Sequence, residues 1–176
     1  KTKHILYISQ AAMIAAVYVV LTYLINSINL ASGAIQIRFS EALTILPFFT
    51  PAAIPGLFVG CILANTLTGC ALWDIIFGSL ATLIGALGTY LLRKHSAFLL
   101  PIPPILANTI IVPFVLRYVY EIPGAIPFLM LTVGIGEVLS CGVLGLLLHR
   151  ILLPYKGRLF AADEASVSPL SDQQNI

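Results

Sequence analysis

The sequence predicts an all-α integral membrane protein, a bundle of six transmembrane helices with the N and C termini in the cytoplasm. Three observations support this fold class. Hydrophobic residues make up 59% of the 176-residue chain and charged residues only 9%, against about 25% in soluble domains. Apolar segments long enough to cross a bilayer follow one another with short connections. Basic residues gather at the segment ends that share one side of the membrane.

The first three helices are predicted from hydropathy and proline positions. Ile5–Ile25 is long enough to cross the hydrocarbon core, and a polar connection follows it to about Ser40. Prolines interrupt the next apolar stretch, so we divide it into Glu41–Phe49 and Ala52–Leu67. Glu41–Phe49 is too short to cross upright. It either begins within the preceding connection or lies inside the protein, where irregular backbone is tolerated.

The last three helices are separated by turns and connections rich in glycine, proline or charge. They span about Trp73–Leu92, Pro104–Tyr120 and Ile126–Leu153. Together the six helices place residues 1–158 in one membrane domain. Residues 159–176 are far more polar than the helices, and we predict that they form a disordered cytoplasmic tail.

The basic residues orient the predicted bundle. Six spans place both termini on one side, and seven of the nine Lys and Arg residues then fall on that side. The positive-inside rule identifies it as cytoplasmic. The seven are Lys1, Lys3, Arg93, Lys94, Arg150, Lys156 and Arg158. The remaining two, Arg38 and Arg117, lie outside, close in sequence to acidic residues.

One carboxylate lies far from any predicted helix end. Glu137 falls well inside the last helix, near the bilayer midplane, and its local sequence offers no partner. Ionisable groups at this depth cost several kcal/mol unless they face a cavity or a partner, and they mark functional sites by default. Glu137 is therefore the first candidate for binding a ligand, and Asp74 is the second. Asn65 and Asn108 add buried amides that either join helices or bind the ligand.

The other charged residues have structural interpretations as well as functional ones. Arg117 and Glu121 have the i,i+4 spacing of a helix surface pair, and we favour that reading. Arg38 and Glu41 are close enough in sequence to pair with one another. Asp74 also suits the first turn of its helix, where a carboxylate meets free amides and the positive end of the dipole.

Several classes of function are excluded by missing motifs. The chain contains no catalytic motif, so we predict that it is not an enzyme. It also lacks the GxxxxGK[ST] phosphate loop, so it does not hydrolyse ATP by itself. Cys61, Cys70 and Cys141 are widely spaced within apolar runs and are interpreted as small packing residues, and no metal site is predicted. The net charge of +2 is too small to indicate a nucleic-acid partner.

Small residues on the first helix allow another helix to pack closely against it. Ala11 with Ala15, and Ala12 with Ala16, form two overlapping small-xxx-small pairs. Such pairs let helix backbones approach in membranes. Their spacing does not show whether the partner helix belongs to this bundle or to another protein.

Residues 37–78 carry a resemblance to a known family. The segment begins Ile-Arg-Phe-Ser-Glu-Ala-Leu-Thr-Ile-Leu-Pro and ends Trp-Asp-Ile-Ile-Phe-Gly. Six short spans, a long connection after the first helix and the alanine strip resemble the S components of energy-coupling-factor (ECF) vitamin transporters. Residues 37–78 resemble, more closely, the queuosine-precursor transporter (QueT) family. The similarity covers roughly residues 5–155 and excludes the tail.

The resemblance implies a substrate-binding S component in the plasma membrane of a prokaryote. Such a subunit docks on a transmembrane coupling subunit and two ATPases, which use the ATP, and carries no cofactor itself. The resemblance places Ala11, Ala12, Ala15 and Ala16 against the coupling subunit. The implied cargo is a 7-deazaguanine such as queuine, preQ1 or preQ0, held in the outer half of the bundle.

Side-chain chemistry suggests roles toward such a base. One carboxylate can accept both N1–H and the amino group of a guanine-like edge; Glu137 suits this role best, with Asp74 second. Asn108 would serve the O6/N7 side. Arg38 is a candidate latch that pairs with Glu41 when the first loop closes. The candidates for stacking on the base are Phe39, Trp73 and Tyr118.

Two alternatives to this function remain open. One is an S component for another vitamin. The other is a stand-alone, proton-coupled secondary transporter, because Glu137 is equally suited to relay protons. Copurification with an ATPase pair favours either S component, whereas uptake by this chain alone, collapsed by an uncoupler, favours the secondary transporter.

Overall fold

The computed structural model describes residues 2–27 and 38–160, and every regular element in these two ranges is helical. Four helical segments are long and apolar enough to cross a membrane: Lys3–Ser27, Leu72–Leu92, Ala97–Tyr118 and Ile126–Leu159. Phe39–Phe48 and Ala53–Leu67 are apolar but shorter. The chain is therefore an all-α, multi-pass membrane protein, as the sequence predicted.

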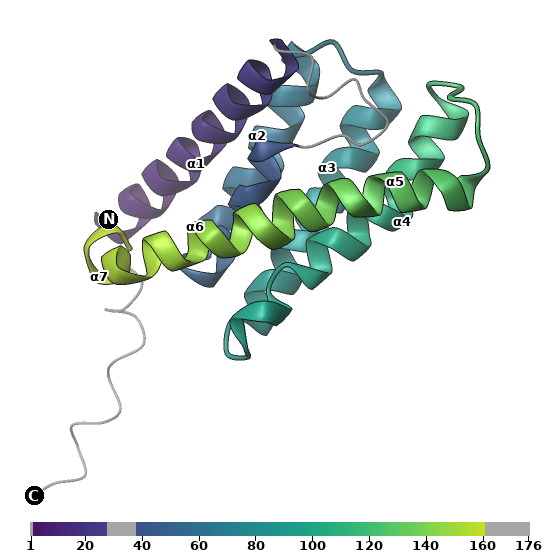
Figure 1. Cartoon of the computed structure of the whole chain (residues 1–176). Coiled ribbons are helices and arrows are strands. Elements are labelled where there is room, and N and C mark those ends of the chain that lie inside the picture. The colour runs from purple at the N-terminus through teal and green to yellow at the C-terminus, as the bar shows by residue number, and fades with distance from the viewer. Residues whose placement is uncertain (1, 28–37, 161–176) are drawn as a thin grey trace, which may run out of the picture.

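Helices that follow one another in the chain mostly pack side by side. The elements are α1 (Thr2–Ser27), η1 (Phe39–Phe48), α2 (Ala53–Leu67), α3 (Leu72–Leu92), η2 (Ala97–Leu99), α4 (Ile102–Tyr118), α5 (Ile126–Glu137), η3 (Val138–Leu144), α6 (Gly145–Leu152), η4 (Leu153–Tyr155) and α7 (Lys156–Leu159). α1 packs on α2, α2 on α3, α3 on α4 and α4 on α5. In Figure 1, α5, η3 and α6 form one continuous rod, with α7 beside the start of α1.

The short element η1 lies inside the bundle. It contacts α1, α2, α3, η3 and α6, and its residues from Ser40 to Pro47 are all buried. The sequence predicted a short helix here without specifying its winding, and the segment is a 3₁₀ helix that contains Pro47. Both placements that the sequence left open apply: the element begins at Phe39, within the predicted connection, and it lies inside the protein.

Glycines on α2 let α1 approach closely. A Cβ added to Gly56 would lie 2.7 Å from the carbonyl oxygen of Ala11, and one added to Gly60 would lie 3.0 Å from the Cα of Ala15. Neither distance leaves room for a side chain. This contact fixes α1 against α2 and holds Tyr18 of α1 in the core, where it is 1% exposed.

The alanine strip of α1 is consequently divided between two faces. Ala15 is buried and Ala11 half-buried, whereas Ala12 and Ala16 are exposed. The spacing left their partner open, whereas the family resemblance placed all four against the coupling subunit. Ala11 and Ala15 instead pack within the bundle because the two pairs, offset by one residue, point to different sides of the helix.

A second close crossing joins α3 to α4. Cβ atoms added to Gly85 and Gly88 of α3 would lie 2.7 Å and 2.3 Å from Pro104 and Pro103 of α4, respectively. The hydroxyl of Thr89 donates to the Leu100 carbonyl oxygen at 2.8 Å at the same end. These contacts hold together the two helices that carry Asp74 and Asn108.

The last long helix changes its winding directly after Glu137. α5 ends at that residue, η3 continues as a π-helix over Val138–Leu144, and α6 resumes the α-helical turn. The sequence predicted one regular helix over Ile126–Leu153. A π segment inside an α-helix has a wider turn and is frequent at functional sites.

The end of the described chain folds back on the bundle. The Leu159 carbonyl oxygen accepts a hydrogen bond from Gln10 Nε2 at 3.4 Å, and the Phe160 ring stacks on Phe49 with centroids 5.3 Å apart. These two residues belong to the folded part, although the sequence analysis assigned them to the tail. The rest of the predicted tail, 161–176, lies outside the described residues.

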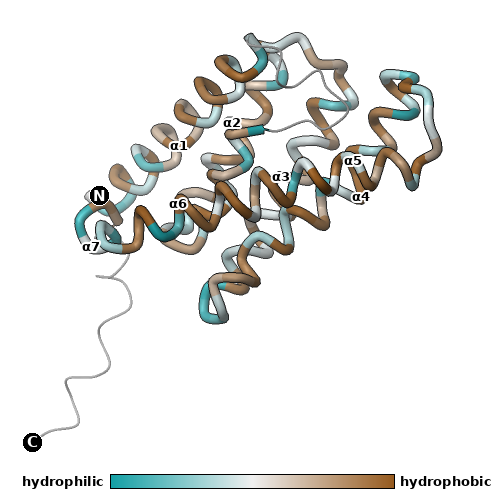
Figure 2. Tube along the Cα trace, in the orientation of Figure 1, coloured by the Kyte–Doolittle hydropathy of each residue, from teal (hydrophilic) through white to brown (hydrophobic). Residues whose placement is uncertain are grey.

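Large apolar side chains cover the outer surface of the long helices. On α1, for example, Ile5, Met13 and Leu24 are each more than half exposed. Figure 2 shows hydrophobic residues along most of the length of the helices. Such a surface is unusual for a soluble monomer but is compatible with lipid tails, because the helices satisfy their own backbone hydrogen bonds.

Candidate functional site

Two carboxylates and a thiol meet where η1 packs against the α5–η3 rod. One donor atom each from Glu41, Glu137 and Cys141 can be chosen so that all three lie within 4.8 Å of one another, and all three residues are buried. The position of Glu41 follows from the burial of η1. Glu137 and Cys141 are one helical turn apart, on either side of the change from α to π winding.

The two carboxylates accept different numbers of hydrogen bonds from neighbouring side chains. The Tyr18 hydroxyl donates to Oε1 of Glu41 at 2.7 Å, while Oε2 of Glu41 is buried without a partner. Oε2 of Glu137 accepts two hydrogen bonds, from Asn108 Nδ2 and from the Cys141 thiol, both at 3.2 Å. Glu41 therefore retains a free acceptor atom inside the protein.

The structure supplies the partners that the sequence did not reveal for Glu137. We had expected no local partner, but Cys141 is four residues away, and a helical spacing rule would have found it. Cys141 also contacts the Thr44 hydroxyl at 3.5 Å, so its role goes beyond packing. Tyr18 was missed altogether, because nothing in an apolar first helix points to a residue on η1.

Asp74 belongs to a separate polar contact. Its Oδ2 accepts a hydrogen bond from the Tyr120 hydroxyl at 2.9 Å, and that same hydroxyl accepts from the Ala71 amide at 3.1 Å. Burial raises the pKa of Tyr120, and the neighbouring Asp74 carboxylate adds to this rise, so the phenol stays a neutral donor at ordinary pH. No hydrogen bond joins Asp74 to Glu137 among the described residues, although the two are the first and second candidates for ligand binding in the sequence.

A small polar cavity of about 60 Å³ lies next to η1. Its lining includes Arg38, Ser40 and Asn65, together with Phe39. Asn65 donates to the Cys61 sulfur of its own helix at 3.6 Å, and the Ser40 hydroxyl is buried without a partner. Three residues that the sequence predicted for the site, Arg38, Phe39 and Asn65, thus gather around one cavity.

Arg38 stays charged but forms no ion pair within 4.0 Å in the described ranges. Burial lowers the pKa of its guanidinium, yet the carboxylates of Asp74 and Glu41 raise it by more. The Arg38–Glu41 pair that their spacing allows is thus not formed in this structure, and the Glu41 carboxylate accepts a hydrogen bond from Tyr18 instead. The latch that forms when the first loop closes stays a prediction. The backbone N–H of Arg38 donates to the Ser140 hydroxyl at 3.1 Å, which ties the start of η1 to η3.

The predicted surface pair between Arg117 and Glu121 is also absent from the described residues. α4 ends at Tyr118, and Glu121 has a backbone φ of 54°, so the two side chains do not share a helix face. Arg117 instead donates to the Ile122 carbonyl oxygen at 3.3 Å. The helix stops earlier than the predicted boundary at Tyr120.

Comparison with known proteins decides the family. The family described as QueT transporter matches residues 8–154. This range includes the residues joined around the two carboxylates, called the polar cluster below: Tyr18, Glu41, Asn108, Glu137 and Cys141. The chain belongs to the QueT transporter family. The queuosine precursor transporter QueT of Lactococcus lactis subsp. cremoris (strain MG1363) is 38% identical over 74 residues, which cover 42% of this chain and 43% of that protein. This chain thus matches less than half the length of that relative. No solved structure matches it.

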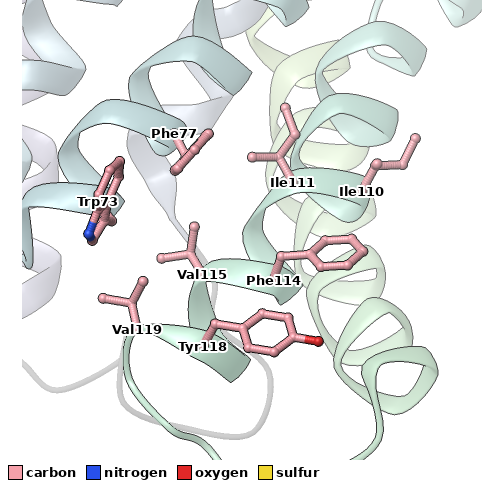
Figure 3. A pocket seen from close by; sticks show the side chains of 8 residues that line it. All are labelled: Trp73, Phe77, Ile110, Ile111, Phe114, Val115, Tyr118 and Val119. Carbon is pink, nitrogen blue, oxygen red and sulfur yellow. The ribbon is translucent and has the colours of Figure 1, made fainter.

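Two of the predicted stacking residues of this QueT family member lie away from the polar cluster. Trp73 and Tyr118 line an apolar cavity of about 620 Å³ between α3 and α4, together with Phe77 and Phe114 (Figure 3). The Trp73 side chain is 56% exposed and that of Tyr118 70%. No residue of the polar cluster lines this cavity. Its surface is suited to lipid or another apolar group rather than to the polar edge of a base.

Proposed function

We propose that this protein is the substrate-binding S component of an ECF-type importer and binds a queuosine precursor, a 7-deazaguanine. The family match and the name of the Lactococcus relative, a queuosine precursor transporter, support this cargo. The sequence lacks a phosphate-binding loop of its own. Energy for uptake would then come from ATP hydrolysis in two partner ATPases, passed through a transmembrane coupling subunit.

The observation that carries the proposal is the buried pair of Asn108 and Glu137. The edge of a guanine-like base presents O6, N1–H and an amino group in a row, one acceptor followed by two donors. A carboxylate accepts two parallel N–H bonds, and an adjacent amide N–H donates to the acceptor. Asn108 Nδ2 lies 3.2 Å from Glu137 Oε2, so the two side chains offer the complementary row in the same order.

The proposed arrangement in the membrane follows from the charges and the short helices. We count η1 and α2 with the four longer segments as six helices of the S-component type. Arg93, Lys94 and Arg150 lie at the predicted cytoplasmic end, whereas Asp74 and Arg38 belong to the opposite end. Both termini then face the cytoplasm of a prokaryotic cell, across its plasma membrane.

The proposed partner surface is the exposed half of the alanine strip. Ala12 and Ala16 are exposed on α1, and small side chains let a second helix approach closely. The coupling subunit is the partner that we propose for this face. Ala11 and Ala15 are already covered by α2.

A binding assay on the purified full chain tests the proposal. We expect 7-deazaguanines to bind and to raise the melting temperature, while thiamine, riboflavin and biotin have no effect. Glu137→Gln removes the negative charge of the carboxylate that accepts two hydrogen bonds from the base. The affinity for deazaguanines should then fall roughly 10- to 100-fold, as expected for charge-assisted hydrogen bonds. Glu121→Gln is the matched control, because Glu121 is exposed and lies outside the cluster.

Two outcomes would replace the proposal. A response to a vitamin and to no deazaguanine would make the protein an S component for that vitamin. The adjacent carboxylates of Glu41 and Glu137 favour the second candidate, a proton-coupled transporter. Uptake into vesicles that contain this chain alone, abolished by an uncoupler, would establish that mechanism instead.

A further inference from the structure

The buried polar region carries more negative than positive groups. Glu41, Asp74 and Glu137 are all buried, and Arg38 is the basic residue whose charge acts on Glu41 and Asp74. None of these carboxylates forms an ion pair within 4.0 Å in the part of the chain that the structure describes. Three carboxylates against one guanidinium leave a deficit that protons or a cation must neutralise, because an uncompensated buried charge is very costly.

The rest of the chain offers no further cation for this region. Residues 28–37 contain no charged residue, and residues 161–176 contain acidic residues but no Lys or Arg. Arg117 is engaged with a carbonyl oxygen of its own loop. The remaining basic residues belong to the predicted cytoplasmic end. A cation that neutralises the cluster must therefore come from outside this chain.

Two buried oxygen atoms of η1 are available as acceptors, and the one on Glu41 lies beside a second carboxylate. Glu41 Oε2 and the Ser40 hydroxyl are both buried without a hydrogen-bond partner, in side chains that are each 1% exposed. Donor atoms of Glu41 and Glu137 lie within 4.8 Å of each other. An ammonium nitrogen bonds a carboxylate oxygen at about 2.8 Å, so Oε2 of Glu41 can accept such a group beside the Glu137 carboxylate.

We infer that Glu41 binds an ammonium group carried by the substituent at position 7 of the deazaguanine. This inference rests on the proposed function. In a 7-deazapurine, C7 takes the place of N7, which shares one edge of the base with O6. A base held by Glu137 and Asn108 therefore carries its 7-substituent on the O6 side. Glu41 is the carboxylate close enough to Glu137 to meet that group.

The consequence is a preference for cationic precursors over neutral ones. A 7-aminomethyl group is protonated at neutral pH and donates to carboxylates, whereas a 7-cyano group is neutral and has no N–H. The cyano group would leave Glu41 Oε2 unpartnered and the charge deficit in place. Glu41 thus determines specificity within the class of deazaguanines, while Glu137 recognises the edge that all of them share.

The test compares two ligands on wild-type protein and one variant. The Kd values of 7-aminomethyl-7-deazaguanine and 7-cyano-7-deazaguanine are measured by calorimetry on the purified full chain in detergent, with EDTA present. We expect the aminomethyl ligand to bind roughly 10- to 100-fold more tightly, the range of a charge-assisted hydrogen bond. Glu41→Gln should weaken the binding of the aminomethyl ligand alone and so remove most of this difference in affinity. Glu121→Gln should preserve the difference.

Each contrary result has a distinct meaning. If wild-type protein binds both ligands equally well, the inference is overturned and the proposed function stands. If it binds neither ligand, the proposed function itself fails. If the preference for the aminomethyl ligand persists in Glu41→Gln, another residue binds the ammonium group and the inference is overturned.

Two further results complete the test. If Glu41→Gln does not fold, Glu41→Asp keeps the charge but shortens the side chain, and an unchanged preference in that variant would also overturn the inference. Binding that is lost with EDTA and restored by Zn²⁺ would show that Glu41, Glu137 and Cys141 hold a metal ion instead.

Discussion

At the residue scale, Glu41 and Glu137 differ in the number of hydrogen bonds that their carboxylates accept. One oxygen of Glu137 receives donors from α4 and from its own helix. Glu41 receives a single side-chain donor in the described structure, the Tyr18 hydroxyl, and its other oxygen receives none. A buried polar atom without a partner destabilises the fold by about 1–3 kcal/mol. This cost is easier to understand if Oε2 of Glu41 is kept free for a ligand.

Tyr18→Phe tests how far the fold depends on that single donor. The change removes only the hydroxyl, so packing in the core is preserved, but both oxygens of Glu41 are then without a side-chain donor. We expect a loss of about 1–2 kcal/mol in the free energy of unfolding, measured by chemical denaturation in detergent. Tyr23→Phe on the same helix is the control, since Tyr23 is 57% exposed. Equal stability of both variants would show that the Tyr18–Glu41 bond contributes nothing.

Individual site residues were predictable only where depth or spacing marks them. Glu137 stands out because a carboxylate in the middle of an apolar span needs a reason to be there. Cys141 follows from helical spacing once Glu137 is chosen. Tyr18 and Tyr120 each reach a carboxylate on another element, and such pairs depend on how helices pack. Hydropathy along one chain contains no information about them.

At the element scale, the helix positions follow hydropathy, whereas their winding does not. The predicted segments Trp73–Leu92 and Ala52–Leu67 differ by one residue at the start from α3 (Leu72–Leu92) and α2 (Ala53–Leu67). The 3₁₀ winding of η1 and the π winding of η3 were not predicted. Both concern hydrogen-bond register within an already apolar run, and both occur where the carboxylates meet.

Gly56→Ala tests the close crossing of α1 and α2. The new Cβ would lie 2.7 Å from the Ala11 carbonyl oxygen and 3.1 Å from the Ile14 Cβ, so the helices must separate. We expect a loss of about 1–3 kcal/mol in the free energy of unfolding, as in other overpacked cores. Gly142→Ala is the control, because a Cβ there would meet side chains only at 3.8 Å or more. A variant as stable as the control would show that the crossing is looser than described.

At the scale of the whole molecule, α1 has two apolar sides with different partners. One side carries Ala11, Ala15 and Tyr18 and is covered by α2 and η1. The other carries Ala12 and Ala16 and remains exposed. The sequence placed all four alanines in one strip because i,i+4 spacing is the same for both pairs. Only the position of α2 separates residues that stabilise the bundle from residues that are free to bind another protein.

Leucine substitutions at Ala15 and Ala16 test this separation. Ala15→Leu places a large side chain against α2 at a crossing where even a Cβ added to Gly60 would lie 3.0 Å from the Ala15 Cα, so we expect a loss of about 1–3 kcal/mol in unfolding free energy. Ala16→Leu should leave stability and deazaguanine binding unchanged. If the proposed coupling subunit packs there, it should reduce copurification with that subunit and the ATPases at least tenfold, because a close helix contact cannot accept the added bulk. Full complex formation by a stable Ala16→Leu protein would place the coupling subunit on another face of the bundle.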